Sequence, residues 1–323
     1  MLSTTLARFT RPRRQAVAGI ALALALTVGC AAPTGAPAPQ TAEKLVIAVQ
    51  PTNTPEQLST DAGELRSFLQ QRLGRDVELV FPTTFAGVIE ALRFGHAHAA
   101  FMSAWPAALA QKHAGAEVAL AEVREVVIGD QKVDATYYFS YWVVRKDSPI
   151  TSVGELRGRR VAVPSQLSTS GYVAPMARLV ELGLLPASNS EVDPKQFFGD
   201  VILAGGYAQG WEALKTGQVD ATVIAGDVAE SLYREVLDNT RVIETQGPIP
   251  SHGVVFAKNL EGPARTQLRD ALMELGSPEH RPLMRKFISG IFVGFTPTTG
   301  AEHLASLDSY LAVTQLAFVE RMR

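Results

Sequence analysis

The chain passes from a short apolar run through a hydroxyl-rich turn into a helical pattern in Arg159-Arg-Val-Ala-Val-Pro-Ser-Gln-Leu-Ser-Thr-Ser-Gly-Tyr-Val173. The run predicts a strand, and the apolar spacing over 173–184 predicts a helix. The first amides of a helix lack partners within it and carry partial positive charge, so this junction can bind an anion. Hydroxyl donors and a glycine that admits a ligand close to the backbone fill the turn, namely Ser168, Thr169, Ser170 and Gly171. The alternative is that a hydroxyl here, of Ser168 or Thr169, only caps the helix.

Apolar runs of strand length recur on both sides of this junction. They predict strands at 44–50, 76–81, 97–102, 135–144, 200–204, 219–224, 241–244 and 254–257. Helical patterns follow most of them, Gly247–Pro250 is predicted to be a rigid connector, and the pattern after residue 257 is helical, at about 263–275, 279–289 and 302–321. Strands that alternate with helices predict an α/β fold, in which ligands bind beyond the carboxyl ends of the strands.

The N-terminal region has the pattern of an export signal. Four arginines precede an apolar segment at 16–28 that is too short for a permanent transmembrane helix, so we interpret residues 1–29 as a signal peptide. Cys30 follows as in a bacterial lipobox, which predicts lipidation, although Thr27 stands where lipoboxes usually carry leucine. The alternative is an ordinary secretory signal cut near Ala31 or Ala32. Residues 30–43 are rich in Ala, Pro, Thr and Gly and are predicted to be a flexible tether.

Composition excludes several classes of function. The net charge is −2, with no basic block after residue 14, so nucleic acid is not an expected partner. The single cysteine allows neither a disulfide framework nor a thiolate metal site. His96 and His98 could face the same way, but no Cys or acidic partner accompanies them, so we interpret both as solvated loop residues. Glu302 and His303 are placed on an exposed helix. No catalytic, metal or cofactor motif is present, so the sequence predicts no enzyme and no cofactor.

Seven segments together match one family of proteins. They are Ala48-Val-Gln-Pro-Thr52, Gly87-Val-Ile-Glu-Ala-Leu-Arg-Phe-Gly95, Tyr141-Trp-Val-Val-Arg-Lys-Asp-Ser-Pro-Ile150, Leu156-Arg-Gly-Arg-Arg-Val161, Ser168-Thr-Ser-Gly-Tyr172, Gly217-Gln-Val-Asp-Ala221 and Pro248-Ile-Pro250. The chain resembles the phosphate, phosphite and phosphonate periplasmic binding proteins of ABC importers over nearly all of its mature part. The Ser-Thr-Ser-Gly turn after a strand is the most specific match. By this resemblance, Ser168, Thr169 and Ser170 anchor the phosphorus oxyanion.

The resemblance implies further ligand-binding residues. Phe85 stands where the family often has a tyrosine, and it cannot donate a hydroxyl hydrogen bond. Tyr207 stands in place of a histidine and can still donate through its phenol. Asp227 matches the family's carboxylate, which accepts a hydrogen bond from a protonated ligand oxygen or an amino group. No Arg or Lys is needed at the anion. Thr54, Trp105 and Tyr138 complete the candidate site, because they lie in or near the same loops.

The predicted architecture is therefore the type II periplasmic binding protein fold, with two α/β lobes, each a mixed sheet flanked by helices, and two hinge crossings. Lobe one holds residues 44–138 plus 250–323, and lobe two holds 139–249. We expect a monomeric lipoprotein, anchored in the periplasm or on the outer face of the cell membrane, that binds a small oxyanion by hinge closure and delivers it to an ABC permease.

Three alternatives remain. One is an enzyme on the same scaffold, such as a pyrimidine-forming protein of thiamine synthesis, but such enzymes use histidine and cysteine in the cleft, and the export signal and the lone Cys30 argue against this. Another is a sensor subunit that presents the ligand to a membrane kinase. The third is a receptor for a sulfonate or another organic acid.

Overall fold

A computed structural model describes residues 44–51, 55–128, 131–187 and 192–314. The predicted signal peptide, the tether, Cys30 and Thr54 lie outside these ranges. Within them, no helix combines the length and the apolar character that a membrane crossing requires.

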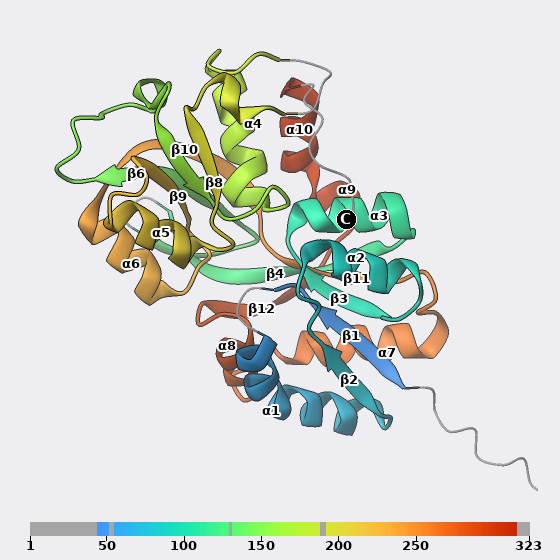
Figure 1. Ribbon diagram of the computed structural model, residues 1–323. Helices are drawn as coiled ribbons and strands as arrows, with labels where there is room; N and C mark the ends of the chain where they lie inside the picture. Colours follow the sequence, from blue (N-terminus) through green and yellow to red (C-terminus); the bar gives the residue numbers. More distant parts are fainter. Residues whose placement is uncertain (1–43, 52–54, 129–130, 188–191, 315–323) are drawn as a thin grey trace, which may run out of the picture. The chain divides into compact units, whose positions relative to one another are not determined.

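The described strands form two separate sheets (Figure 1). Seven of them form the first sheet, and its members are β1 Leu45–Val49, β2 Val77–Val80, β3 Ala99–Met102, β4 Glu117–Ile128, β5 Gln131–Ala135, β11 Gly253–Phe256 and β12 Phe292–Pro297. The order is β12-β4-β11-β3-β1-β2, with β5 paired to β4. The strands β2, β1 and β3 are parallel, β11 is antiparallel to both β3 and β4, and β12 is antiparallel to β4.

Five described strands form the second sheet in the order β10-β6-β9-β7-β8. Its members are β6 Tyr137–Arg145, β7 Arg160–Val163, β8 Asp200–Leu203, β9 Ala221–Ala225 and β10 Thr240–Pro250. The strands β8, β7 and β9 are parallel, and β6 and β10 are antiparallel to their neighbours. We call the parts that carry the seven-stranded and the five-stranded sheets the first lobe and the second lobe.

Helices cover both faces of each sheet, which explains why the central strands are apolar throughout rather than alternating. They are α1 Pro55–Leu73, α2 Phe85–Arg93, α3 Ala104–Ala114, α4 Ala174–Glu181, α5 Tyr207–Lys215, α6 Glu230–Asn239, α7 Gly262–Glu274, α8 Arg281–Phe287, α9 Gly300–His303 and α10 Ala305–Thr314, with short turns η1 Val153–Leu156, η2 Thr169–Val173 and η3 Pro194–Gln196. In the first lobe α1, α7 and α8 pack on one face and α2 and α3 on the other. In the second lobe α4 packs opposite α5 and α6.

The chain crosses between the lobes where β5 leads into β6 and where β10 leads into β11. These crossings lie side by side, because the Ser251 amide donates a 2.8 Å hydrogen bond to the Thr136 carbonyl. Beyond them, α10 contacts the second lobe, since the Tyr310 hydroxyl donates to the Pro248 carbonyl at 3.2 Å and the helix lies beside α4 (Figure 1). The lobe boundaries given above stay a prediction.

Several local predictions were incomplete or wrong. The sequence pattern predicted no element where the structure has β4. It also predicted only helices after residue 257 and so missed the strand β12, which pairs with β4. Residues 247–250 belong to the long strand β10 rather than to a connector. His303 is buried and its Nε2 lies 3.0 Å from the Ser251 carbonyl oxygen. His98 is half-buried, and its Nδ1 accepts a 3.0 Å hydrogen bond from the Val46 amide, so it is not a solvated residue.

Gly171 provides a test of the packing in the hydroxyl-rich turn. A Cβ there would overlap the Pro164 ring and lie 2.9 Å from Ser168 Oγ. We expect Gly171→Ala to lower the free energy of unfolding by about 1–3 kcal/mol through overpacking. Gly63→Ala is the matched control, because nothing lies within 4 Å of its Cβ in α1, and it should raise that free energy by about 0.5–1 kcal/mol. Denaturant titrations measure both, and the same sign for the two variants would contradict the packing.

Candidate functional site

A cavity of about 730 Å³ lies between the two lobes. The first lobe contributes the ends of β1 and β3, the loop before α2, the middle of β4 and the end of α8. The second lobe contributes the loops that follow β7, β8 and β9. The cavity thus lies beyond the carboxyl ends of the parallel strands of both sheets, where ligands bind in such sheets.

The loop after β7 places Ser168 in the cavity wall. Its Oγ accepts a 3.0 Å hydrogen bond from the Gly171 amide, so this serine caps the turn η2 and lines the cavity as well. The Ser168 hydroxyl therefore caps the helical turn, as the alternative to the site prediction held, and it also lies where it could bind a ligand. The turn η2 is a π-helical turn that leads directly into α4, and its residues are all buried.

Ser170 is the centre of a cluster of hydroxyl groups. Its Oγ accepts a 3.0 Å hydrogen bond from the Tyr138 hydroxyl and lies 2.7 Å from the Tyr207 hydroxyl. Tyr207 also lies 3.4 Å from Ser168 Oγ. The backbone of Ser170 is held by the second sheet. Ser140 Oγ on β6 donates to the Ser170 carbonyl at 2.8 Å, and it accepts a hydrogen bond from Gln246 Nε2 on β10 at 2.8 Å. The predicted residues Ser168, Ser170, Tyr207 and Tyr138 are thus brought together.

Thr169 and Gly171 do not line the cavity, although both were predicted to bind the ligand. Thr169 is 1% exposed, and its Oγ1 accepts a 2.8 Å hydrogen bond from the Trp105 amide at the start of α3. This bond joins the two lobes beside the cavity. Trp105 and Tyr138 are buried and do not line it either. Phe85 does line the cavity, on the first-lobe side.

Asp227, which follows β9, forms an ion pair with a residue of the other lobe. Its Oδ2 accepts a 2.8 Å hydrogen bond from Arg124 Nη1, and the Arg124 Nη2 group is bound to Glu122 at 2.6 Å. His252 Nε2 lies 3.5 Å from the same Asp227 oxygen. Arg124 is only 2% exposed, yet it lines the cavity together with Asp227 and His252. One guanidinium is therefore shared by two buried carboxylates.

Burial sets the protonation of these groups. It raises the pKa of Asp227 and that of Glu122, and the Arg124 guanidinium opposes both shifts. It lowers the pKa of His252 well below the usual value, and Arg124 adds to this shift.

The pKa values of two tyrosines are raised, like those of the two carboxyl groups. Burial raises the pKa of Tyr207 and of Tyr138, and the charge of Asp227 adds to both shifts. Near neutral pH, the Tyr207 phenol and the His252 imidazole in the cavity wall are therefore neutral, beside the charged Arg124 guanidinium.

Sequence reasoning missed Arg124, Glu122 and His252. A signal for the first two was present in β4, where the residues at 118, 120, 122, 124 and 126 are buried in alternation. Charged residues at two inward positions of an otherwise apolar alternation indicate a buried ion pair rather than a solvated face. Sequence alone could not identify Asp227 as the partner, because it lies 103 residues away.

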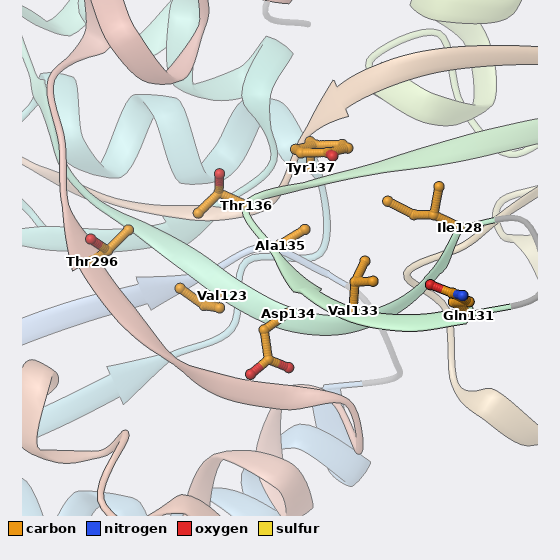
Figure 2. A pocket seen from close by; sticks show the side chains of 9 residues that line it. All are labelled: Val123, Ile128, Gln131, Val133, Asp134, Ala135, Thr136, Tyr137 and Thr296. Carbon is orange, nitrogen blue, oxygen red and sulfur yellow. The ribbon is translucent and has the colours of Figure 1, made fainter.

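Another cavity, of about 580 Å³, lies along the β4–β5 hairpin (Figure 2). Figure 2 shows the side chains of this hairpin beside Tyr137 and Thr296. Its described lining holds one carboxylate, Asp134, and no Arg, Lys or His, so it does not suit an anion. No group of three or more His, Cys, Asp or Glu residues that could hold a metal ion occurs within the described ranges.

The fold and the site define a two-lobed binding protein with a polar cleft. The family model of the ABC transporter, phosphonate, periplasmic substrate-binding protein matches residues 47–304. The chain therefore belongs to this family, whose members are binding proteins rather than enzymes.

Individual relatives agree with this assignment. The chain is 30% identical over 207 residues to the phosphate-import protein PhnD of Mycolicibacterium smegmatis, a match over 64% of this chain and 62% of that protein, so it spans less than two thirds of that relative. It is 24% identical over 266 residues to the phosphonates-binding periplasmic protein of Escherichia coli, over 79% of this chain and 70% of that one. A binding-protein component of an ABC phosphonate transporter from Pseudomonas aeruginosa shares the fold, with a TM-score of 0.67, 20% identity and coverage of 84% of this chain and 86% of that one.

Arg124→Met would leave two buried carboxylates without their cation. We expect the free energy of unfolding at pH 7 to fall by about 3–5 kcal/mol. Because the folded-state pKa values of Glu122 and Asp227 are raised, the native state binds protons more readily than the unfolded state, and part of the loss should return as the pH falls from 7 toward 5. Urea titrations at both pH values measure this.

Arg269→Met is the control for this variant, because it removes only an exposed pair with Asp270, which contributes about 0–1 kcal/mol. Equal losses in the two variants would show that the Arg124 cluster has no special role in stability.

His252→Gln tests the buried imidazole. The unfolded chain takes up a proton near the ordinary pKa of 6.5, whereas the native state does not, so the wild type loses stability as the pH falls. At pH 5.5, the variant should have lost about 1.4 kcal/mol less than the wild type, relative to pH 7.5. The comparison requires unfolding free energies of both proteins at each pH. A difference that does not change with pH would mean that His252 takes up its proton in the native state as it does in the unfolded chain.

Proposed function

We propose that this protein is an extracytoplasmic solute-binding lipoprotein of an ABC importer, and that it binds a phosphorus oxyanion in the cavity between its lobes. Family membership supports the general role, a periplasmic receptor that delivers a small ligand to a membrane permease. The names of the relatives, one for phosphate import and one for phosphonate binding, support a phosphorus oxyanion as the ligand. Lipidation of Cys30 and a monomeric state are part of the proposal.

The observation that carries the proposal is the convergence of neutral hydroxyl donors and the buried Arg124 guanidinium on a single cavity. Ser168, Ser170 and Tyr207 supply hydroxyls from the second lobe, and Arg124 reaches the cavity from the first. Hydrogen bonds to an ionised acceptor are stronger than neutral ones, so a few such donors suffice to bind an oxyanion. A guanidinium also matches the geometry of phosphorus oxygens. Arg124 thus adds a cation that the sequence did not lead us to expect.

Asp227 has two roles in this proposal. It accepts the hydrogen bond of Arg124 in the structure. By the family resemblance it also accepts a hydrogen bond from a protonated ligand oxygen or an amino group, which two fully ionised oxyanions could not share.

Closure of the lobes follows from the division of the donors. Ser168 and Ser170 lie in one lobe and Arg124 in the other, so only a closed form offers the ligand both sets. The ligand then shifts the equilibrium toward this form by its differential contacts. We propose the crossings at Thr136 and Ser251 as the hinge.

A double variant tests the anion site. Ser168→Ala combined with Ser170→Ala removes two hydroxyls that face the cavity, and each charge-assisted bond contributes about 1.5–3 kcal/mol. We expect affinity for methylphosphonate, phosphite or phosphate, whichever binds the wild type, to fall at least about 100-fold in calorimetry. Ser67→Ala is the control, since its hydroxyl donates to the Gly63 carbonyl on an exposed helix face and Ser67 does not line the cavity. Unchanged affinity in a folded double variant would reject the site.

A further inference from the structure

The cavity has room for much more than a small oxyanion. Its volume of about 730 Å³ falls in the range of about 300–1,000 Å³ that is typical of sites for larger organic ligands. The hydroxyl cluster and Arg124 account for one polar region of its lining, and Gln50, Gln209, Arg285 and Lys286 add further polar groups. The lining also holds a set of apolar side chains that a small oxyanion would not contact.

Four apolar side chains form what we call the apolar rim, namely Phe85, Val228, Leu232 and Ile288. Each lines the cavity and is half-buried, so each keeps part of its surface available to a ligand. Phe85 and Ile288 come from the first lobe, and Val228 and Leu232 come from the second. The rim therefore faces the cavity from both sides.

The rim residues are held in place by the lobe cores behind them. Val228 and Leu232 pack against the cluster that joins α5, α6 and the second sheet. Ile288 packs against the cluster of α1, α7 and α8. Phe85 begins α2, whose first turn is capped by the hydrogen bond from the Gly87 amide to Thr84 Oγ1, at 3.0 Å. A surface that is fixed in this way is prepared for a ligand before the ligand arrives.

Two bonds between the lobes set the width of the cavity. The Trp105 amide donates to Thr169 Oγ1, and Arg124 Nη1 donates to Asp227 Oδ2, both at 2.8 Å. These lengths are already normal for hydrogen bonds, so the lobes cannot approach further at these points without compressing them. Closure around a four-oxygen anion would thus leave the rim unfilled.

We propose that the apolar rim binds the organic substituent of a phosphonate or phosphate monoester, and that the cleft selects organophosphorus anions with an apolar substituent over phosphate, phosphite and methylphosphonate. The inference rests on the proposed function, because the phosphorus group occupies the hydroxyl cluster. Phe85 is central to it, since the phenyl ring offers an apolar surface and no donor to a further oxyanion oxygen.

Calorimetry with an alkyl series tests the proposal. The probes are inorganic phosphate and the methyl, n-propyl and n-butyl phosphonates. Each buried methylene contributes about 0.8 kcal/mol, or roughly fourfold in affinity, so the three added methylenes of n-butylphosphonate should make it bind up to about 60-fold more tightly than methylphosphonate. The heat capacity change of binding should also become more negative along the series, as expected for apolar burial.

Variants of the rim residues test whether the apolar rim causes the gain in affinity. Leu232→Ala and Phe85→Ala should each reduce the gain in affinity per methylene, whereas Leu182→Ala, an apolar residue 39% exposed outside the cavity, should retain it. Equal or weaker binding of the longer phosphonates, with methylphosphonate bound, would overturn the rim and leave the proposed function intact. No binding of any phosphorus oxyanion would overturn both, and an equal gain in the rim variants would place the substituent elsewhere.

Discussion

The pairing of Arg124 with Glu122 and Asp227 is the interaction on which the rest of the structure depends. Removing an ion from water costs several kcal/mol, so these three groups are stable in the interior only while they remain together. Glu122 and Arg124 belong to the first lobe and Asp227 to the second. The ion cluster therefore fixes how the two lobes meet, and it places a cation at the wall of the cavity without leaving it exposed to solvent.

The hydroxyl cluster complements this charge. Ser170 contacts two phenols, and the backbone behind it is held by Ser140 and Gln246, so its position depends on residues of β6 and β10 rather than on the loop alone. Burial keeps the phenols protonated, which preserves them as donors. Neutral donors in a fixed array can stabilise an oxyanion without the desolvation cost of further buried cations.

The sequence predicted the parts of the fold that local pattern controls. The apolar runs at β1 and β9 and the hydroxyl-rich turn were recognisable because strand burial and helix capping depend on neighbouring residues. The strand β4 was missed because Glu122 and Arg124 interrupt its apolar alternation, and only a partner far along the chain makes these charges acceptable inside. The family resemblance placed Thr169 at the oxyanion, and no local pattern could show that its hydroxyl also accepts a hydrogen bond from the Trp105 amide of the other lobe.

The helix α10 limits how the lobes can move. It begins beside α9, which packs on β4, and its Tyr310 hydroxyl reaches the Pro248 carbonyl at the end of β10, so one helix bridges both sides of the proposed hinge. Pulling the lobes apart along this edge would break its packing against α4, whereas swinging them apart at the opposite edge would not. The two lobes would then separate at the edge opposite α10 while α10 holds them together at its own edge. A solute would enter the cavity from the side away from α10.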